Sequence, residues 1–122
     1  MRRATSATAM ARVVALAPDL FFASKVQETL SAAGHDVEVR TTVADALEAA
    51  RIADVVIVDL HAEELDLATF SRQLAGKPLL GFYSHVDVEV KQSAEEAGFD
   101  LVVPRSRMAR EMPELVAGLV NR

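Results

Sequence analysis

The chain of 122 residues is 51% hydrophobic, contains no cysteine and has a formal net charge of −5. This length suits one domain with a substantial core, and the lack of cysteine excludes disulfide scaffolds, thiolate metal sites and cysteine nucleophiles while fitting a reducing cytoplasm. The acidic balance argues against a nucleic-acid partner bound through its phosphates, and no apolar run approaches the length of a membrane span.

The N-terminal residues 1–11 are small and polar apart from two arginines, and they lack the apolar centre of a signal peptide. We expect a disordered lead-in over 1–11 and a single domain over 12–122.

The first strand is predicted over 12–17, and Pro18 with Asp19 then opens a helix over 20–33. Gly34 is placed to end that helix in the left-handed conformation. The helix should bury a stripe that contains Leu20, Val26, Leu30 and Ala33.

Polar and apolar residues alternate over 35–40, which predicts an edge strand with one exposed face. A helix should follow over 43–52, with Thr42 as its N-cap and Asp45 at the third helical position, in a variant of the capping box.

The run over 54–60 is the most informative stretch, because four β-branched apolar residues lead directly into Asp59. A strand that is apolar on both faces belongs to a parallel sheet covered by helices on each side. Ligands bind such sheets outside the carboxyl ends of the strands, so Asp59 lies where a site is expected.

The rest of the chain repeats the same alternation of strands and helices. Pro113 falls inside the last helix, so that helix should start nearer Pro113 or bend around Met112. The predicted elements are a helix over 67–75, a strand over 79–84, a helix over 87–97, a strand over 101–103 and a helix over 108–120.

Five strands alternating with five helices predict an α/β fold with a doubly wound parallel sheet, and five units are too few for an eight-stranded barrel. The pattern resembles the receiver domain of two-component response regulators over 12–122. That family has a flavodoxin-like (βα)5 fold, a three-layer sandwich with strand order 2-1-3-4-5. The resemblance is carried by Gly34, Asp59, Ser84, Ala97 and Gly98.

The resemblance also implies a site, and this chain departs from it. The family's phospho-acceptor acid corresponds to Asp59, but the acid pair that holds Mg²⁺ falls on Ala17 and Pro18, with Asp19 adjacent. Asp19 and Asp59 are the only, weak, magnesium candidates, since Mg²⁺ needs carboxylates to hold it.

Other family positions are partly kept. Ser84 matches the hydroxyl that bonds the phosphoryl group, the lysine position falls on Arg105, and the switch aromatic is replaced by Val102. Arginine keeps the charge of lysine but not its shape. The span from Asp59 to Ser84 is short, and its loop of His61, Ala62, Glu63 and Glu64 lacks the usual proline and glycine.

We therefore predict a degenerate, stand-alone receiver-like module with no enzymatic activity and no cofactor, acting on another protein in the cytoplasm independently of phosphorylation. A homodimer would use the face formed by the fourth helix (87–97), fifth strand (101–103) and fifth helix (108–120). The first alternative is an atypical phospho-acceptor that uses Asp59, Ser84 and Arg105 with Mg²⁺. The second is a small flavodoxin-like ligand-binding protein or hydrolase.

Three local features have two interpretations each. Ser84 and His85 beside Asp59 suggest a nucleophile and base, but capping of the following helix is the simpler interpretation. Arg105 is expected to pair with Asp59 while Ser106 caps the last helix. Of the adjacent Phe21 and Phe22, only one can face the core, and exposure of the other would favour an interaction role.

Overall fold

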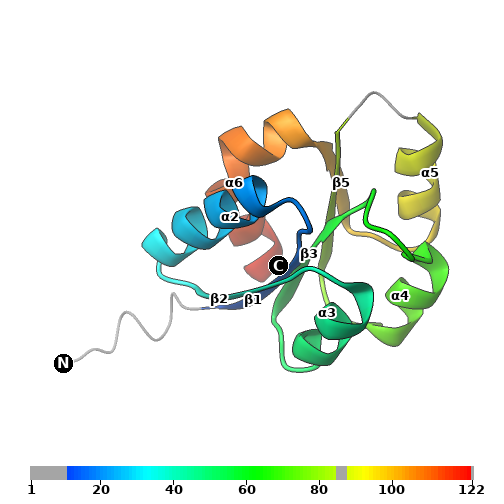
Figure 1. Cartoon of the computed structure of the whole chain (residues 1–122), viewed down its shortest axis with the longest axis horizontal. Coiled ribbons are helices and arrows are strands. Elements are labelled where there is room, and N and C mark those ends of the chain that lie inside the picture. Colours follow the sequence, from blue (N-terminus) through cyan, green and yellow to red (C-terminus); the bar gives the residue numbers. More distant parts are fainter. Residues whose placement is uncertain (1–10, 85–87, 122) are drawn as a thin grey trace.

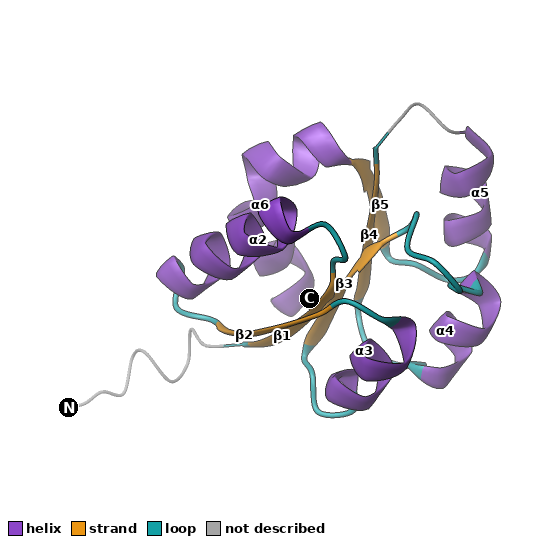
Figure 2. Cartoon of the chain, in the orientation of Figure 1, coloured by secondary structure: helices purple, strands orange, loops and turns teal. Residues whose placement is uncertain are grey.

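The computed structural model describes residues 11–84 and 88–121, and over these ranges five parallel strands alternate with five helices (Figures 1 and 2). The strand order is β2-β1-β3-β4-β5, as predicted for a flavodoxin-like sheet. The strands are β1 (Arg12–Leu16), β2 (Asp36–Arg40), β3 (Val55–Asp59), β4 (Leu79–Tyr83) and β5 (Leu101–Pro104). The helices are α2 (Leu20–Ala32), α3 (Val43–Ala50), α4 (Leu67–Gln73), α5 (Val88–Glu96) and α6 (Arg105–Val120).

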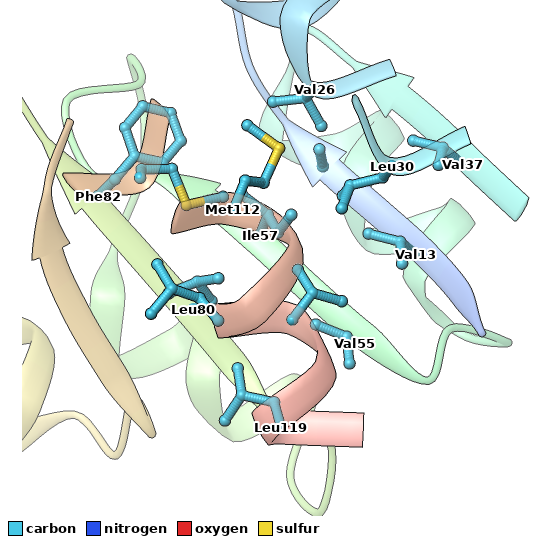
Figure 3. Close-up of a cluster of buried hydrophobic side chains, with 14 of the residues drawn as sticks. Val13, Val26, Leu30, Val37, Val55, Ile57, Leu80, Phe82, Met112 and Leu119 are labelled. Carbon is cyan, nitrogen blue, oxygen red and sulfur yellow. The ribbon is translucent and has the colours of Figure 1, made fainter. Parts of the chain in front are cut away.

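Two hydrophobic cores lie on opposite faces of the sheet. Helices α2 and α6 cover one face, and α3, α4 and α5 cover the other (Figure 1). Because successive strand residues point to opposite faces, Val13 and Ala15 enter the first core while Val14 and Leu16 enter the second. Figure 3 shows the first core, where Met112 of α6 lies among strand residues that include Ile57. Every residue of β3 is buried, which confirms the interpretation of the Asp59 strand.

The first helix differs from its prediction in one respect. Val26 and Leu30 are buried as expected, but Leu20 is 71% exposed and Ala33 is also exposed. Phe22 takes the inward position instead, because residues 22, 26 and 30 are four apart and share one face of a helix. Gly34 follows this helix at φ +96°, the left-handed conformation that was predicted for it.

The edge position of β2 and the cap of α3 agree with the sequence. β2 pairs only with β1 in the described sheet, and the hydroxyl of Thr42 accepts the backbone N–H of Asp45 at 3.2 Å. This contact satisfies one of the N–H groups that the first turn of a helix leaves without a partner.

The last helix starts earlier than predicted. It begins at Arg105, directly after β5, so Ser106 lies inside its first turn and the prediction that Ser106 caps the helix is wrong. The N-cap residue is Pro104, whose extended backbone suits that position. The predicted bend is present at Glu111 (φ −121°, ψ 19°), two residues before Pro113, which has no N–H for the helix ladder.

Ala11, just before β1, packs against the sheet. Ala11 is buried, and its carbonyl accepts the N–H of Asp36 at 2.9 Å. The rest of the predicted lead-in lies outside the described residues. None of the helices in the described ranges has the length and apolar character to cross a membrane.

Candidate functional site

The candidate site lies at the edge of the sheet where the parallel strands end. Asp59 is the last residue of β3, Ser84 follows β4, and Arg105 follows β5. The loop after β1 brings Asp19 to the same edge. Chain segments far apart in sequence therefore meet where ligands of such sheets bind. His85, the remaining predicted site residue, is outside the described residues.

Asp59 is the buried acid of this edge, with 8% of its surface exposed. One carboxylate oxygen, Oδ1, accepts the backbone N–H of His61 at 2.9 Å. The Asp59 backbone carbonyl accepts the N–H of Ala62 at 3.1 Å. The side chain thus closes the turn that leaves β3, which is a structural role that aspartate commonly performs.

The two positions of the family's acid pair provide no carboxylate. Ala17 is buried, and its N–H bonds the carbonyl of Arg40 at 2.9 Å, extending the ladder between β1 and β2. Pro18 is exposed and has neither an acidic side chain nor a backbone N–H. Neither the methyl group of Ala17 nor the ring of Pro18 offers an atom that could ligate a metal.

Asp19 uses both of its carboxylate oxygens within the protein. Oδ1 accepts the backbone N–H groups of Phe21 at 2.9 Å and Phe22 at 3.3 Å, which caps α2. Oδ2 accepts a hydrogen bond from Nη2 of Arg105 at 2.6 Å. The Arg105 guanidinium is the main reason why the pKa of this carboxyl lies below its usual range, and the Phe22 N–H adds to the effect.

Arg105 therefore pairs with Asp19 and not with Asp59, so the predicted Arg105–Asp59 contact is wrong. The reason is the direction of the side chain at the start of α6, which lies across the first turn of α2. Its Cζ lies 4.4 Å from the centroid of the Phe22 ring, an arrangement in which the positive charge meets the negative face of the ring.

The carboxylates of Asp19 and Asp59, with their present partners, do not fit a magnesium ion. Mg²⁺ requires oxygen ligands in near-octahedral geometry, usually one or two carboxylates completed by water and phosphate. Asp19 is occupied by Arg105 and by the helix cap, and one oxygen of Asp59 is occupied by His61. A cation from the chain itself already neutralises the acid after β1.

No protein-family model and no curated protein matches the sequence. Solved structures do match it. A CheY-like response regulator receiver domain protein from Methanospirillum hungatei JF-1 has a TM-score of 0.83 at 14% identity, covering 92% of this chain and 94% of that chain. A receiver domain from Clostridium thermocellum has a TM-score of 0.81 at 16% identity, covering 92% and 95%. NtrX from Brucella abortus has 0.82 at 19% identity, with 92% of this chain covering 27% of that longer protein. This chain has the fold of a response regulator receiver domain.

An aromatic pair lies beside the site, and the sequence analysis did not predict this pair. The rings of Phe22 and Phe82 are 4.7 Å apart at 41°, a tilted arrangement that is favourable for aromatic side chains. Phe82 is fully buried and pairs with Asp59 across β3 and β4. Val102, at the family's switch-aromatic position, is also buried. The apolar run over 79–84 predicted burial of Phe82, but nothing in it identified Phe22 as its partner.

A wide hollow lies near the N-terminal ends of the strands, at the other end of the sheet from Asp59. It has a volume of about 980 Å³ and is lined by residues before β4 and β5, among them Lys77, Pro78, Gly98 and Asp100. An enclosed apolar pocket beside Asp59 would support the ligand-binding or hydrolase alternative. This hollow is open, is partly polar and is not adjacent to the candidate site residues.

The lowered pKa of Asp19 leads to a prediction with a defined sign. A carboxyl whose pKa is lower in the folded than in the unfolded protein adds stability above the unfolded pKa, and this contribution is lost as the pH falls through the folded pKa. Arg105→Gln should move the pKa of Asp19 up toward its usual range. A carbon-detected NMR titration of the side-chain carboxyls measures this directly.

Asp66 is the matched control for that titration. Its pKa is also lowered, but chiefly by the hydroxyl of Thr69 in the cap of α4. The Asp66 pKa should be the same in the Arg105→Gln variant as in the parent protein. An Asp19 pKa that also stays unchanged would contradict the pairing with Arg105.

Proposed function

We propose that this chain is a receiver-like signalling module that acts by binding another protein, without a phosphorylation cycle and without catalysing a reaction. The observation that carries the proposal is the pairing of Asp19 with Arg105 at 2.6 Å, at a site where Ala17 and Pro18 replace the family's acids. Neither of the family's acid positions then supplies a carboxylate beside Asp59, and Asp19 is already paired with Arg105.

The chemistry of phosphoryl transfer supports this proposal. The transferred group carries charge that must be neutralised, and catalysis depends almost entirely on positioning and electrostatic stabilisation. Because Asp19 is paired with Arg105, the loop after β1 provides no free carboxylate that could help Asp59 to hold a charge-neutralising cation. Phosphorylation of Asp59 would also place new negative charge on a side chain that closes its own turn through His61.

The exposed residues of α2 support an interaction role. Phe21 is 90% exposed and Leu20 is 71% exposed, whereas large apolar side chains on a monomer are usually covered. A homodimer through the face of α5, β5 and α6 remains a further proposal for this module. We propose that the module acts in the cytoplasm, because a chain without cysteine suits a reducing compartment.

Beryllofluoride tests the proposal, because with Mg²⁺ it mimics a phosphoryl group on an aspartate. We expect the amide spectrum of ¹⁵N-labelled protein to be unchanged when Mg²⁺ and beryllofluoride are added. Asp59→Asn is the control that removes the acceptor. Saturable shifts at residues 59, 84 and 105 that disappear in Asp59→Asn would contradict the proposal and establish the atypical phospho-acceptor.

A further inference from the structure

The hollow at the N-terminal ends of the strands has a volume of about 980 Å³, which is the size of many ligand sites. Three helices end at its wall: Leu74 and Ala75 follow α4, Glu96 is the last residue of α5, and Leu119 and Val120 end α6. The C-terminal end of a helix carries partial negative charge, because its last carbonyl groups have no N–H partner within the helix. The wall of the hollow therefore attracts positive charge at three places.

Acidic side chains add to this negative potential. Asp54, Glu96 and Asp100 all line the hollow, and all three are exposed. Neither α5 nor α6 has a basic residue in its last turn that would balance the charge of its own C-terminal end. The hollow is thus suited to a cationic occupant.

The basic side chains of the hollow are engaged with the chain itself. Among the described residues, Arg72 and Lys77 are the two that line it. Nζ of Lys77 donates a hydrogen bond to the carbonyl of Ala53 at 2.9 Å, and Nη2 of Arg72 donates to the hydroxyl of Thr69 at 3.3 Å. Both cations therefore have local partners of their own.

Ala11, the first of the described residues, lies in the wall of the same hollow. It is 2% exposed, its N–H donates to Nδ1 of His35 at 3.2 Å, and its carbonyl accepts the N–H of Asp36 at 2.9 Å. The point at which residues 1–10 join the domain is therefore fixed beside the hollow. Ten residues span at most about 33–36 Å, compared with a radius of gyration of about 13 Å for a domain of 100 residues. The segment 1–10 is long enough to reach every part of the hollow, and it contains Arg2 and Arg3 and no acid.

We propose that the segment 1–10 binds in the hollow of its own domain and brings the charges of Arg2 and Arg3 to the acids and helix ends that line it. The attachment of the segment at Ala11 gives it an effective concentration in the millimolar range, at which weak contacts between exposed charges are sufficient. A basic segment of another protein would enter the hollow only by displacing residues 1–10. The contact is independent of the function proposed above, because the hollow lies at the other end of the sheet from Asp59.

A spin label on the full chain tests the proposal. Because the sequence contains no cysteine, Ser6→Cys provides a single attachment point for a nitroxide, which broadens the amide resonances of the residues that it approaches. We expect stronger broadening at Gly76 and Gly98, which line the hollow, than at His35 and Asp36. The latter two lie at the start of β1 but do not line the hollow, so they report a segment that has no preferred position.

Charge substitutions in the labelled protein test the cause of the binding. Arg2→Glu together with Arg3→Glu should reduce the broadening in the hollow about two- to fivefold, because each exposed charge pair contributes modestly. Glu96→Lys should also reduce it, and lysine suits the C-terminal end of a helix, so this variant should fold. Combining Glu96→Lys with the two arginine substitutions should restore part of the broadening, since opposite charges then face each other again. Lys25→Glu, an exposed charge reversal on α2 that does not line the hollow, is the matched control and should leave the broadening unchanged.

Equal broadening at the hollow and at His35 and Asp36 would overturn the proposal, as would broadening in the hollow that neither set of charge substitutions reduces. A mixture of spin-labelled protein without ¹⁵N and ¹⁵N-labelled protein without the spin label detects binding between copies. Broadening of the hollow in this mixture as strong as that within one chain would show that a second copy is the occupant, and this too would overturn the proposal. The beryllofluoride experiment gives a separate result, because it concerns Asp59 at the other end of the sheet.

Discussion

Replacing Phe22 with alanine should lower the free energy of unfolding by about 3–5 kcal/mol, the usual cost of removing a buried aromatic side chain. Phe22 is 6% exposed and contacts both the Phe82 ring and the Arg105 guanidinium, so the variant loses packing on two sides. Urea denaturation followed by circular dichroism measures the change, provided that the slope with denaturant is the same in both proteins.

The neighbouring residue is the control for this experiment. Phe21→Ala removes an identical side chain that is 90% exposed, so it should change the free energy of unfolding by less than about 0.5 kcal/mol. Equal losses in the two variants would show that the first turn of α2 is rotated relative to the arrangement described above. The pair therefore tests the orientation of α2 as well as its packing.

Phe70→Ala should have an effect of similar size in the second core, about 3–5 kcal/mol. Helix α4 has seven residues, and Phe70 is the buried residue within its bounds. Phe70 is 1% exposed, so it provides most of the packing that holds so short a helix on the sheet. Amide exchange should accelerate most strongly over 67–73, because local opening then costs less than global unfolding.

Gln73→Ala is the matched substitution on the same helix. Gln73 is exposed at the last position of α4, so its replacement should change stability by no more than about 0.5 kcal/mol. Rapid exchange over α4 in Gln73→Ala, or its absence in Phe70→Ala, would show that residues outside the helix hold it in place. Both results would be read from the same set of exchange spectra.

Much of the fold follows from local sequence. The alternation of apolar runs and amphipathic segments predicts all five strands and all five helices of the described ranges, because each run matches the period of its element. Gly34 and Thr42 end and begin helices through their own backbone and side-chain chemistry, which depends on a few neighbouring residues. The position of Asp59 at the end of β3 follows from the same reasoning.

The position of α6 could not be read from the sequence with equal accuracy. Residues 105–107 are polar and lack a helical apolar pattern, so local reasoning placed the helix start later. The chain instead enters the helix directly after Pro104, and Met108 and Met112 are buried against the sheet. Packing across the sheet outweighs the weak local signal of the first turn.

The candidate site, like the fold, could be predicted from the sequence only in part. The sequence by itself determined which side chains are present at the sheet edge: an acid at Asp59, a hydroxyl at Ser84, a cation at Arg105, and no carboxylate at Ala17 or Pro18.

Only the tertiary structure decided how these groups pair. Two acids, Asp19 and Asp59, were available to Arg105, and the choice depends on the direction of a side chain at the start of α6 relative to the first turn of α2. The choice of Phe22 over Leu20 for the core depends on Phe82, sixty positions along the chain. Such contacts join residues that are distant in sequence, so no local propensity or periodicity contains them, and they arise only when the helices pack on the sheet.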